Sequence, residues 1–221
     1  MRFSDEFNWD TYSRSYRGEL EHISNVDNQE FFITSYNESE NGKIKFENNL
    51  HPNWMEVYSL VYDLKPKSVF ECGFGGCYHL KNIKKILPDS KIGGIDLLED
   101  QLKLGIEFSS LPKEIIDNLK VASFCDDITT LNIGKYEFVY SQAVVMHLST
   151  NNAIKFLKNM ERVSSKYIFL MEGTKNHRNF YDLVKQTLPD HKFELINHYI
   201  PDPLKQDING PNFSSGILLT K

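Results

Sequence analysis

The stretch Ser68-Val-Phe-Glu-Cys-Gly-Phe-Gly-Gly-Cys-Tyr78 decides the fold of this chain. It begins with a short apolar run that is typical of a buried strand, and Glu71 stands near the end of that run. A glycine-rich turn follows at once, and residues 76–87 have the pattern of a helix. A turn with so little side-chain bulk lets backbone N–H groups and a helix N-terminus approach a ligand closely. The stretch therefore predicts a ligand-binding strand, turn and helix.

The spacing of the glycines separates two kinds of nucleotide ligand. A dinucleotide fingerprint, G-x-G-x-x-G/A, needs Gly or Ala at position 78, where this chain has Tyr78. In addition, Glu71 would face the two negative charges of a pyrophosphate without compensation. These two features disfavour a nicotinamide cofactor and favour a positively charged ligand.

The series Glu71-x-Gly73-x-Gly75-x-Cys77 resembles the first motif of class I methyltransferases, E/D-x-G-x-G-x-G. The cofactor of that family, S-adenosyl-L-methionine, carries a sulfonium and an α-ammonium group. Cys77 replaces the last glycine of the motif, and we expect its small side chain to point into helix–strand packing. The resemblance implies that Glu71, Gly73, Phe74 and Gly75 contact the cofactor.

A second acidic residue, Asp96, ends the strand-like segment 91–96, about one βαβ repeat after the glycine turn. An acidic residue at this place can accept hydrogen bonds from both hydroxyls of a ribose. The alternative role for Asp96 is to cap the N-terminus of the following helix. The resemblance also places Leu97 among the cofactor contacts.

The third predicted strand is followed by the carboxylates of Asp126 and Asp127. In the family that the chain resembles, an acidic residue here meets the adenine amino group, and the next backbone N–H meets a ring nitrogen. The resemblance therefore implies that Asp127 or Asp126 and the backbone of Ile128 bind adenine. The alternative is a solvated turn.

Residues 136–148 resemble the fourth-strand motif of small-molecule methyltransferases, a buried strand that continues into a short helix. The resemblance implies that Ser141 and Gln142 line the cofactor. The ordinary pKa of histidine, about 6.5, suits removal of a proton from an acceptor hydroxyl, so His147 is the candidate catalytic base. Alternatively, His147 holds the loop by bonding to backbone groups.

From Ser68 onward, strand-like and helix-like segments alternate, which predicts an α/β fold with a mainly parallel sheet. The expected strands are near 68–72, 91–96, 119–125, 137–141, 166–172, 191–200 and 213–220. The expected helices are near 51–62, 76–87, 98–109, 151–163 and 176–187. The turn-rich insert around Pro201-Asp-Pro203 indicates an antiparallel return of the last strand. The resemblance implies a Rossmann-like, doubly wound, seven-stranded sheet whose seventh strand lies antiparallel beside the fifth.

Residues 1–50 differ in composition from the rest, being rich in aromatic, Asn and Glu residues. We expect an N-terminal helical cap or lid at 1–50, followed by an adenosylmethionine-binding methyltransferase domain at 51–221. Tyr12 and Tyr16 of the cap, and Glu172 and His177 after the fifth strand, are candidate contacts to an acceptor.

Net charge, the length of the apolar runs and the cysteine content limit the classes of protein to which this chain can belong. The 221 residues carry a formal charge of −5, with no basic stripe of the kind that binds nucleic acid. No apolar run is long enough to span a membrane or to serve as a secretion signal, so we expect a cytoplasmic protein. The three cysteines form neither a disulfide framework nor a zinc motif, and no metal site is expected.

Together these features predict an S-adenosylmethionine-dependent methyltransferase that transfers a methyl group in line to a small-molecule acceptor. O-methylation of a sugar or secondary metabolite is favoured, because the N/D-P-P-Y/F tetrapeptide of nucleic-acid amino-methyltransferases is absent from the fourth strand. The alternatives are a non-catalytic adenosylmethionine-binding module, an N-methyltransferase and an NAD-dependent Rossmann enzyme. The expected partners exclude nucleic acid and membranes, and a homodimer stays open.

Overall fold

The computed structural model describes residues 8–9, 11, 32–48, 50–173, 180–207 and 210–221. A seven-stranded sheet has the strand order β5-β4-β3-β6-β7-β9-β8. Its strands are β3 (Ser68–Cys72), β4 (Lys91–Asp96), β5 (Leu119–Val121), β6 (Tyr136–Gln142), β7 (Ser164–Gly173), β8 (Lys192–Asp207) and β9 (Gly210–Thr220). The helices are α2 (Pro52–Leu64), α3 (Tyr78–Ile86), α4 (Glu99–Ser109), α5 (Lys113–Ile116), α6 (Thr150–Val163) and α7 (Phe180–Thr187), with 3-10 turns η1 (Thr129–Leu131) and η2 (Val145–His147).

The pairing of the strands confirms the predicted α/β class. β3 pairs in parallel with β6, β6 with β7, and β4 with β5. β9 is antiparallel both to β7 and to β8. The sheet is thus mainly parallel, and its last strand runs antiparallel beside the fifth, as the resemblance implied.

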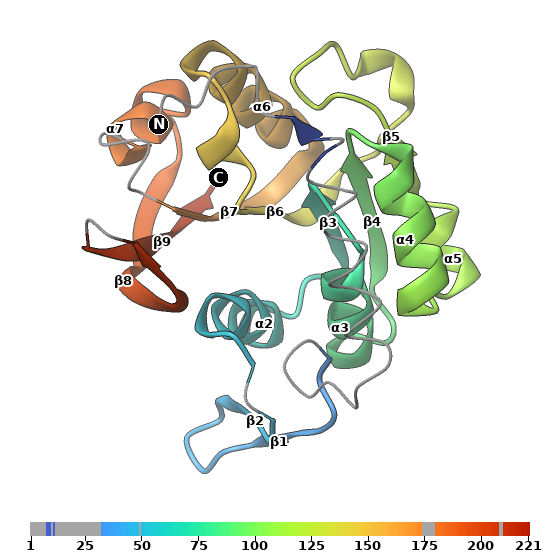
Figure 1. The fold of residues 1–221 in the computed structure, drawn as a ribbon, viewed down its shortest axis with the longest axis vertical. Coiled ribbons are helices and arrows are strands. Elements are labelled where there is room, and N and C mark those ends of the chain that lie inside the picture. The colour runs from blue at the N-terminus through green and yellow to red at the C-terminus, as the bar shows by residue number, and fades with distance from the viewer. Residues whose placement is uncertain (1–7, 10, 12–31, 49, 174–179, 208–209) are drawn as a thin grey trace. The chain divides into compact units, whose positions relative to one another are not determined.

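The chain divides into two compact units, each of which is described by itself. The first contains the described parts of 69–73 and 123–221. Its helix α6 begins after Ser149, whose side chain accepts a hydrogen bond from Asn152 N, and it contacts β6, β7 and α7 (Figure 1). The buried apolar face of α6 includes Phe156, Leu157, Met160 and Val163.

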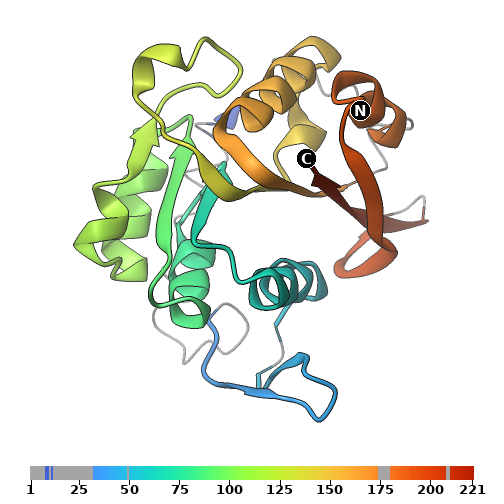
Figure 2. The same cartoon turned by 180° about the vertical axis from the view of Figure 1, so that it is seen from behind.

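The second unit contains the described parts of 8–68 and 74–122. In it α3, α4 and α5 each contact β4, and α4 and α5 lie side by side in both views (Figures 1 and 2). Helix α2 packs on α3, where the Tyr58 hydroxyl lies 2.7 Å from His79 Nδ1. Burial lowers the pKa of His79 to about 3, so this imidazole is neutral at physiological pH.

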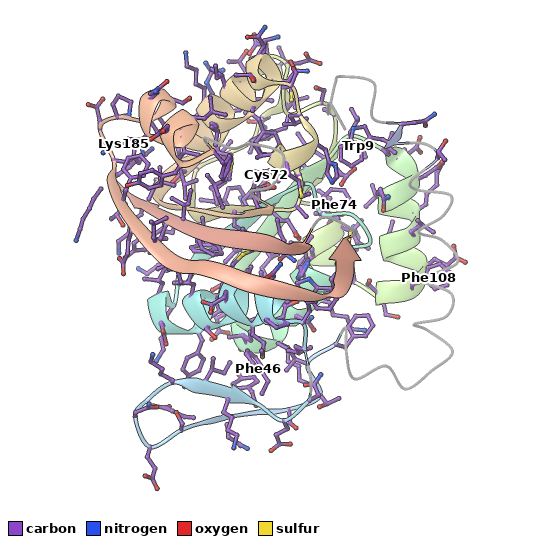
Figure 3. All side chains as sticks on the ribbon, turned by 60° about the vertical axis from the view of Figure 1, so that its left-hand side comes forward. Trp9, Phe46, Cys72, Phe74, Phe108 and Lys185 are labelled. Atoms are coloured by element: carbon purple, nitrogen blue, oxygen red, sulfur yellow. The ribbon has the colours of Figure 1, made fainter. Side chains whose placement is uncertain are left out.

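Residues 32–48 differ from the predicted helical cap. They contain an antiparallel pair of strands, β1 (Tyr36–Glu38) and β2 (Ile44–Phe46), joined by a turn with Gly42 at a φ of 78°. Phe46 packs edge-on against Tyr58 of α2 at 6.0 Å between ring centroids, and Figure 3 shows it between the hairpin and that helix. Most of residues 1–31, including Tyr12 and Tyr16, lies outside the described residues, so a helical cap there stays a prediction.

The ends of β5 and β8 are two of the element boundaries that differ from expectation. β5 ends at Val121 rather than at 125, because Phe124 leaves the strand and packs against Phe70 and Phe156. β8 continues to Asp207, through Pro201, with shifts of register. Pro201 lies on the edge strand of the sheet, which is where sheets tolerate a proline. Of the helices that the structure describes, none is long and apolar enough to cross a lipid bilayer.

Candidate functional site

In the second unit, Asp96 at the end of β4 is bonded to the glycine-rich turn. The Gly75 N–H donates to Asp96 Oδ2 at 2.9 Å, and the Leu98 N–H donates to Oδ1 at 3.1 Å. Burial raises the pKa of Asp96, and the backbone N–H groups of Leu98, Gly75 and Leu97 oppose that rise. A carboxylate has about four lone-pair positions, so beside these three backbone donors Asp96 keeps capacity to accept about one further hydroxyl.

Two apolar side chains stand exposed beside this carboxylate. Leu97 is 47% exposed and Val121 is 40% exposed, and Val121 is the register partner of Asp96 in the β4–β5 pair. Most large apolar residues in the described part of the unit are buried, and the exposed exceptions there are Leu97, Val121 and Ile106 of α4. A carboxylate flanked by apolar surface is chemically suited to a nucleoside, whose sugar is polar and whose base has an apolar face.

Cys77, at the position of the missing motif glycine, adopts a left-handed conformation with a φ of 62°. This conformation explains why a glycine is usual there, because a Cβ costs free energy at positive φ. The Cys77 side chain is fully buried and points at Gly105 of α4, where a Cβ would meet its Sγ at 2.4 Å. The thiol therefore packs against a helix, and Gly105 supplies the space that the thiol needs.

In the first unit, β3 carries Glu71, which is 1% exposed and in register with Tyr140 of β6. Burial, followed by the charge of Glu71, raises the pKa of the Cys72 thiol well above its ordinary value. Gly73 follows with a φ of 86°, and a Cβ there would lie 2.4 Å from Val144 Cγ2. The residues after β6 thus pack directly on the first motif glycine.

The carboxylate of Glu172 organises the turn after β6. Its Oε1 accepts from Ser141 Oγ at 2.9 Å and from Val144 N at 3.3 Å, and its Oε2 accepts from Met146 N at 3.2 Å. Glu172 and Ser141 are both fully buried. The expectation that Glu172 touches an acceptor is therefore wrong in this structure, since its oxygens face the protein. The Ser141 hydroxyl likewise donates its hydrogen bond to Glu172 and does not face outward.

Burial raises the pKa of Glu172 to about 7 from an ordinary 4.5, although the Ser141 hydroxyl, followed by backbone N–H groups of residues 144–146, opposes the rise. A raised pKa in the folded state means that folding binds a proton, so this contribution to stability is present below pH 4.5 and lost as the pH rises through about 7. We expect the stability of wild type relative to Glu172→Gln to fall between pH 5 and 8 by on the order of 3 kcal/mol or less. Urea unfolding of both proteins at four pH values measures the difference, and parallel pH profiles would contradict it.

His147 and Gln142 lie on either side of a strained residue. Ala143 has a φ of 54°, and its N–H donates to Met171 O of β7 at 3.0 Å. His147 is partly buried and ends the turn η2, where its backbone N–H donates to Val144 O at 3.0 Å. The side-chain oxygen of Gln142 is buried and has no hydrogen-bond partner in the described part of the chain. Such an acceptor is available to a donor on a ligand.

The loop after β5 places its two carboxylates in solvent. The Asp127 side chain is 73% exposed, its Oδ1 accepts from Thr129 N at 3.0 Å, and that backbone bond is the main cause of its lowered pKa. Asp126 is also exposed, and its carbonyl accepts from Asn159 Nδ2 of α6 at 2.8 Å. Ile128 is buried at 3% exposure. This geometry is that of the solvated turn, and the adenine role of the loop stays a prediction.

The structure brings together some of the predicted residues, within each unit. It joins Gly75 to Asp96 in the second unit, and in the first it leaves Ser141 bonded to Glu172 rather than facing outward. Phe74 is 1% exposed, so only its backbone can meet a ligand. His177 lies outside the described residues. Among the residues described, no group of three or more His, Cys, Asp or Glu side chains could hold a metal ion.

Sequence reasoning missed three features of these sites. The first is the contact of Val144 with Gly73, which no local pattern announces. The second is the pairing of Cys77 with Gly105, for which an isolated glycine within the helical pattern of 98–109 was an available signal. The third, the clamp formed by Glu172, also had a signal, since an isolated acid in the apolar run Ile168-Phe-Leu-Met-Glu172 is costly unless it is satisfied.

Comparisons with known proteins give the fold a wider context. No protein-family model matches the sequence, and no curated protein matches it significantly. Solved structures do match. The methyltransferase domain of bacterial CtHen1 aligns with a TM-score of 0.58 at 14% identity, over 76% of this chain and 97% of that one. Magnesium protoporphyrin IX methyltransferase from Synechocystis, crystallised with S-adenosylmethionine, aligns with a TM-score of 0.58 at 13% identity, over 76% and 77%.

A putative RNA methyltransferase from Pyrococcus horikoshii matches over nearly the whole of both chains, at 96% of this chain and 98% of that one, with a TM-score of 0.58 and 12% identity. These proteins share the sheet and differ in what their names say they methylate. At such low sequence identities, the structural similarity is evidence for a shared fold alone. The chain therefore has the Rossmann-like fold of the class I methyltransferases.

Proposed function

We propose that this protein binds S-adenosyl-L-methionine and transfers its methyl group to a small-molecule acceptor, most simply to an oxygen atom. The observation that carries the proposal is Asp96, a carboxylate fixed by the Gly75 N–H and flanked by the exposed Leu97. Asp96 accepts a hydrogen bond from the ribose, and Leu97 packs against the base. The fold, which is shared with solved methyltransferases, supports this assignment.

Residues of the first unit fit the remaining chemistry. Glu71 is a buried acid next to the glycine turn, which suits a ligand with positive charge. The buried oxygen of Gln142, which has no partner among the described residues, accepts an N–H of the ligand, and the backbone of Gly73 approaches closely because it has no side chain. Phe74 and Ile128 contribute backbone groups, and Asp126 or Asp127 takes the adenine amino group.

His147 is the proposed general base. The cofactor, when bound, supplies the methyl group on a sulfonium. The protein therefore needs to hold the acceptor in line, exclude water and accept one proton. A neutral His147 imidazole accepts the proton of an acceptor hydroxyl. A small-molecule acceptor is favoured over nucleic acid by the net charge of −5 and the missing tetrapeptide at the fourth strand.

Ligand binding tests the proposal first. Adenosylmethionine and adenosylhomocysteine should raise the melting temperature of the protein, and NAD at the same concentration should not. Transfer of a labelled methyl group into a panel of sugars, phenols, amines and RNA then identifies the acceptor class. Stabilisation by NAD alone, or by none of the three ligands, would overturn the cofactor assignment. Binding without transfer to any member of the panel would leave a non-catalytic binding module.

Asp96→Ala should weaken adenosylhomocysteine binding by about 1–3 kcal/mol, because a charge-assisted contact to the ribose is lost. Isothermal titration calorimetry measures the change. Asp100→Ala is the matched control, since Asp100 is an exposed acid in the first turn of α4 whose side chain is 74% exposed. Equal affinities for the two variants would remove Asp96 from the ribose site.

His147→Ala should leave adenosylhomocysteine affinity nearly intact and lower methyl transfer about a hundredfold or more. The physical reason is that only proton removal from the acceptor is lost. Single-turnover transfer to the acceptor found in the labelled screen measures the rate. A variant with full activity would leave His147 as a residue that merely holds its loop.

A further inference from the structure

The buried carboxylate of Glu172 accepts hydrogen bonds from three donors within residues 141–146. Ser141 Oγ lies 2.9 Å from Oε1, and the N–H groups of Val144 and Met146 lie 3.3 and 3.2 Å from the two oxygens. The side chain is fully buried. Taking a carboxylate out of water is costly unless such donors satisfy it, so this arrangement is a specific feature and not a default packing choice.

The segment that Glu172 holds, Ala143–His147, is constrained at both ends. Ala143 sits in a left-handed conformation with a φ of 54°, which an L-residue keeps only when its surroundings enforce it. Val144 rests on Gly73, where an added Cβ would meet it at 2.4 Å. Met146 fits because Gly173 has no side chain, since a Cβ there would lie 2.9 Å from Met146 Cε.

We propose that Glu172 is a positioning residue that clamps the segment Ala143–His147, so that one carboxylate sets both the seat of Val144 on the glycine turn and the placement of His147. This inference rests on the proposed function for the roles of Gly73 and His147. The clamp links the methyl-donor side of the reaction to the acceptor side. Val144, near one end of the segment, contacts the cofactor-binding glycine turn, and His147, at the other end, is the proposed base for the acceptor.

Glutamine cannot replace Glu172 in this role. Two backbone N–H groups, one to each oxygen, and one hydroxyl converge on the side chain. An amide offers one oxygen and one NH₂ group, so at least one backbone N–H would face a donor. Glu172→Gln keeps the shape and removes that bond. Glu172→Asp keeps the charge but withdraws both oxygens by one methylene.

Hydrogen–deuterium exchange at pH 8 tests the clamp without any assay of activity. We expect Glu172→Gln to speed exchange of the amides of Val144 and Met146 at least tenfold, while peptides of β6 and β7 keep their protection. Adenosylhomocysteine should slow exchange of this segment in wild type, because a loaded glycine turn supports Val144, and should not do so in the variant. Glu194→Gln is the matched control, because Glu194 is an exposed glutamate of β8.

The experiment distinguishes failure of the clamp from failure of the proposed function. Unchanged exchange of the segment in a folded Glu172→Gln protein would overturn the clamp, and so would an increase spread equally over β6 and β7. If that variant does not fold, Glu172→Asp is measured in its place with the same two criteria. Failure of wild type to bind adenosylhomocysteine would instead count against the proposed function, and the exchange of the unliganded proteins would still decide whether Glu172 holds the segment.

Discussion

Gly73→Ala should destabilise the protein by about 2–5 kcal/mol and lower its affinity for adenosylhomocysteine at least tenfold. Two costs add at this position. A φ of 86° penalises any Cβ, and the added methyl would lie 2.4 Å from Val144 Cγ2. Relief of the overlap has to move either the glycine turn or the segment after β6. Urea unfolding and calorimetry measure the two effects.

The two costs of Gly73→Ala can be separated with further variants. Adding Val144→Ala removes the overlapping methyls but not the strain of positive φ, so it should restore about half of the lost stability. Gly134→Ala is the control, because a Cβ at that exposed glycine meets nothing within 4 Å. If Gly73→Ala were as stable as Gly134→Ala, the close approach of Val144 to the glycine turn would be refuted.

Gly105→Ala should also destabilise the protein, by about 1–3 kcal/mol, although helix propensity alone would stabilise it by about 1 kcal/mol. The reversal of sign comes from Cys77, whose Sγ and Cβ would lie 2.4 and 2.8 Å from the new methyl. Thermal and urea unfolding measure the change. The direction of the effect is diagnostic, because an ordinary glycine within a helix gains stability from this substitution.

A double-mutant cycle isolates this contact. Cys77→Gly removes the thiol and suits the φ of 62°, so in the Gly105→Ala background it should restore stability to the wild-type level or above it. The coupling between the two sites should be about 2 kcal/mol. Additive effects of the two substitutions would show that Cys77 does not occupy the space over Gly105.

The elements that the sequence predicted well are those with a local cause. The strands at 68–72 and 91–96 have the boundaries expected from their apolar runs, and the helix expected at 151–163 begins one residue earlier because Ser149 caps it. The prediction of β5 was too long, since Phe124 is apolar and extends the pattern of the strand. Only the aromatic partners of Phe124 in the folded protein show that it leaves the sheet.

The residues of the candidate site likewise fall into those that a local pattern predicted and those whose partners are distant in the chain. Asp96 was identified from its spacing after the glycine turn, and the structure shows its bond to Gly75 at 2.9 Å. Ser141 was assigned to the cofactor from a resemblance, yet its hydroxyl donates to Glu172, which is 31 residues away in the chain. No periodicity over a few residues can report such a partner.

The α/β alternation, the position of the glycine turn and the acid that ends β4 were predictable from the sequence, because backbone propensity and hydrophobic period act between neighbours along the chain. The folded protein was needed to show how Cys77 is accommodated where a glycine is usual, and which groups donate hydrogen bonds to Glu172. Both answers depend on contacts between side chains that are far apart in the chain and meet only after the strands and helices have packed. Steric overlap and hydrogen bonding act over a few ångströms in space, and sequence separation does not measure that distance.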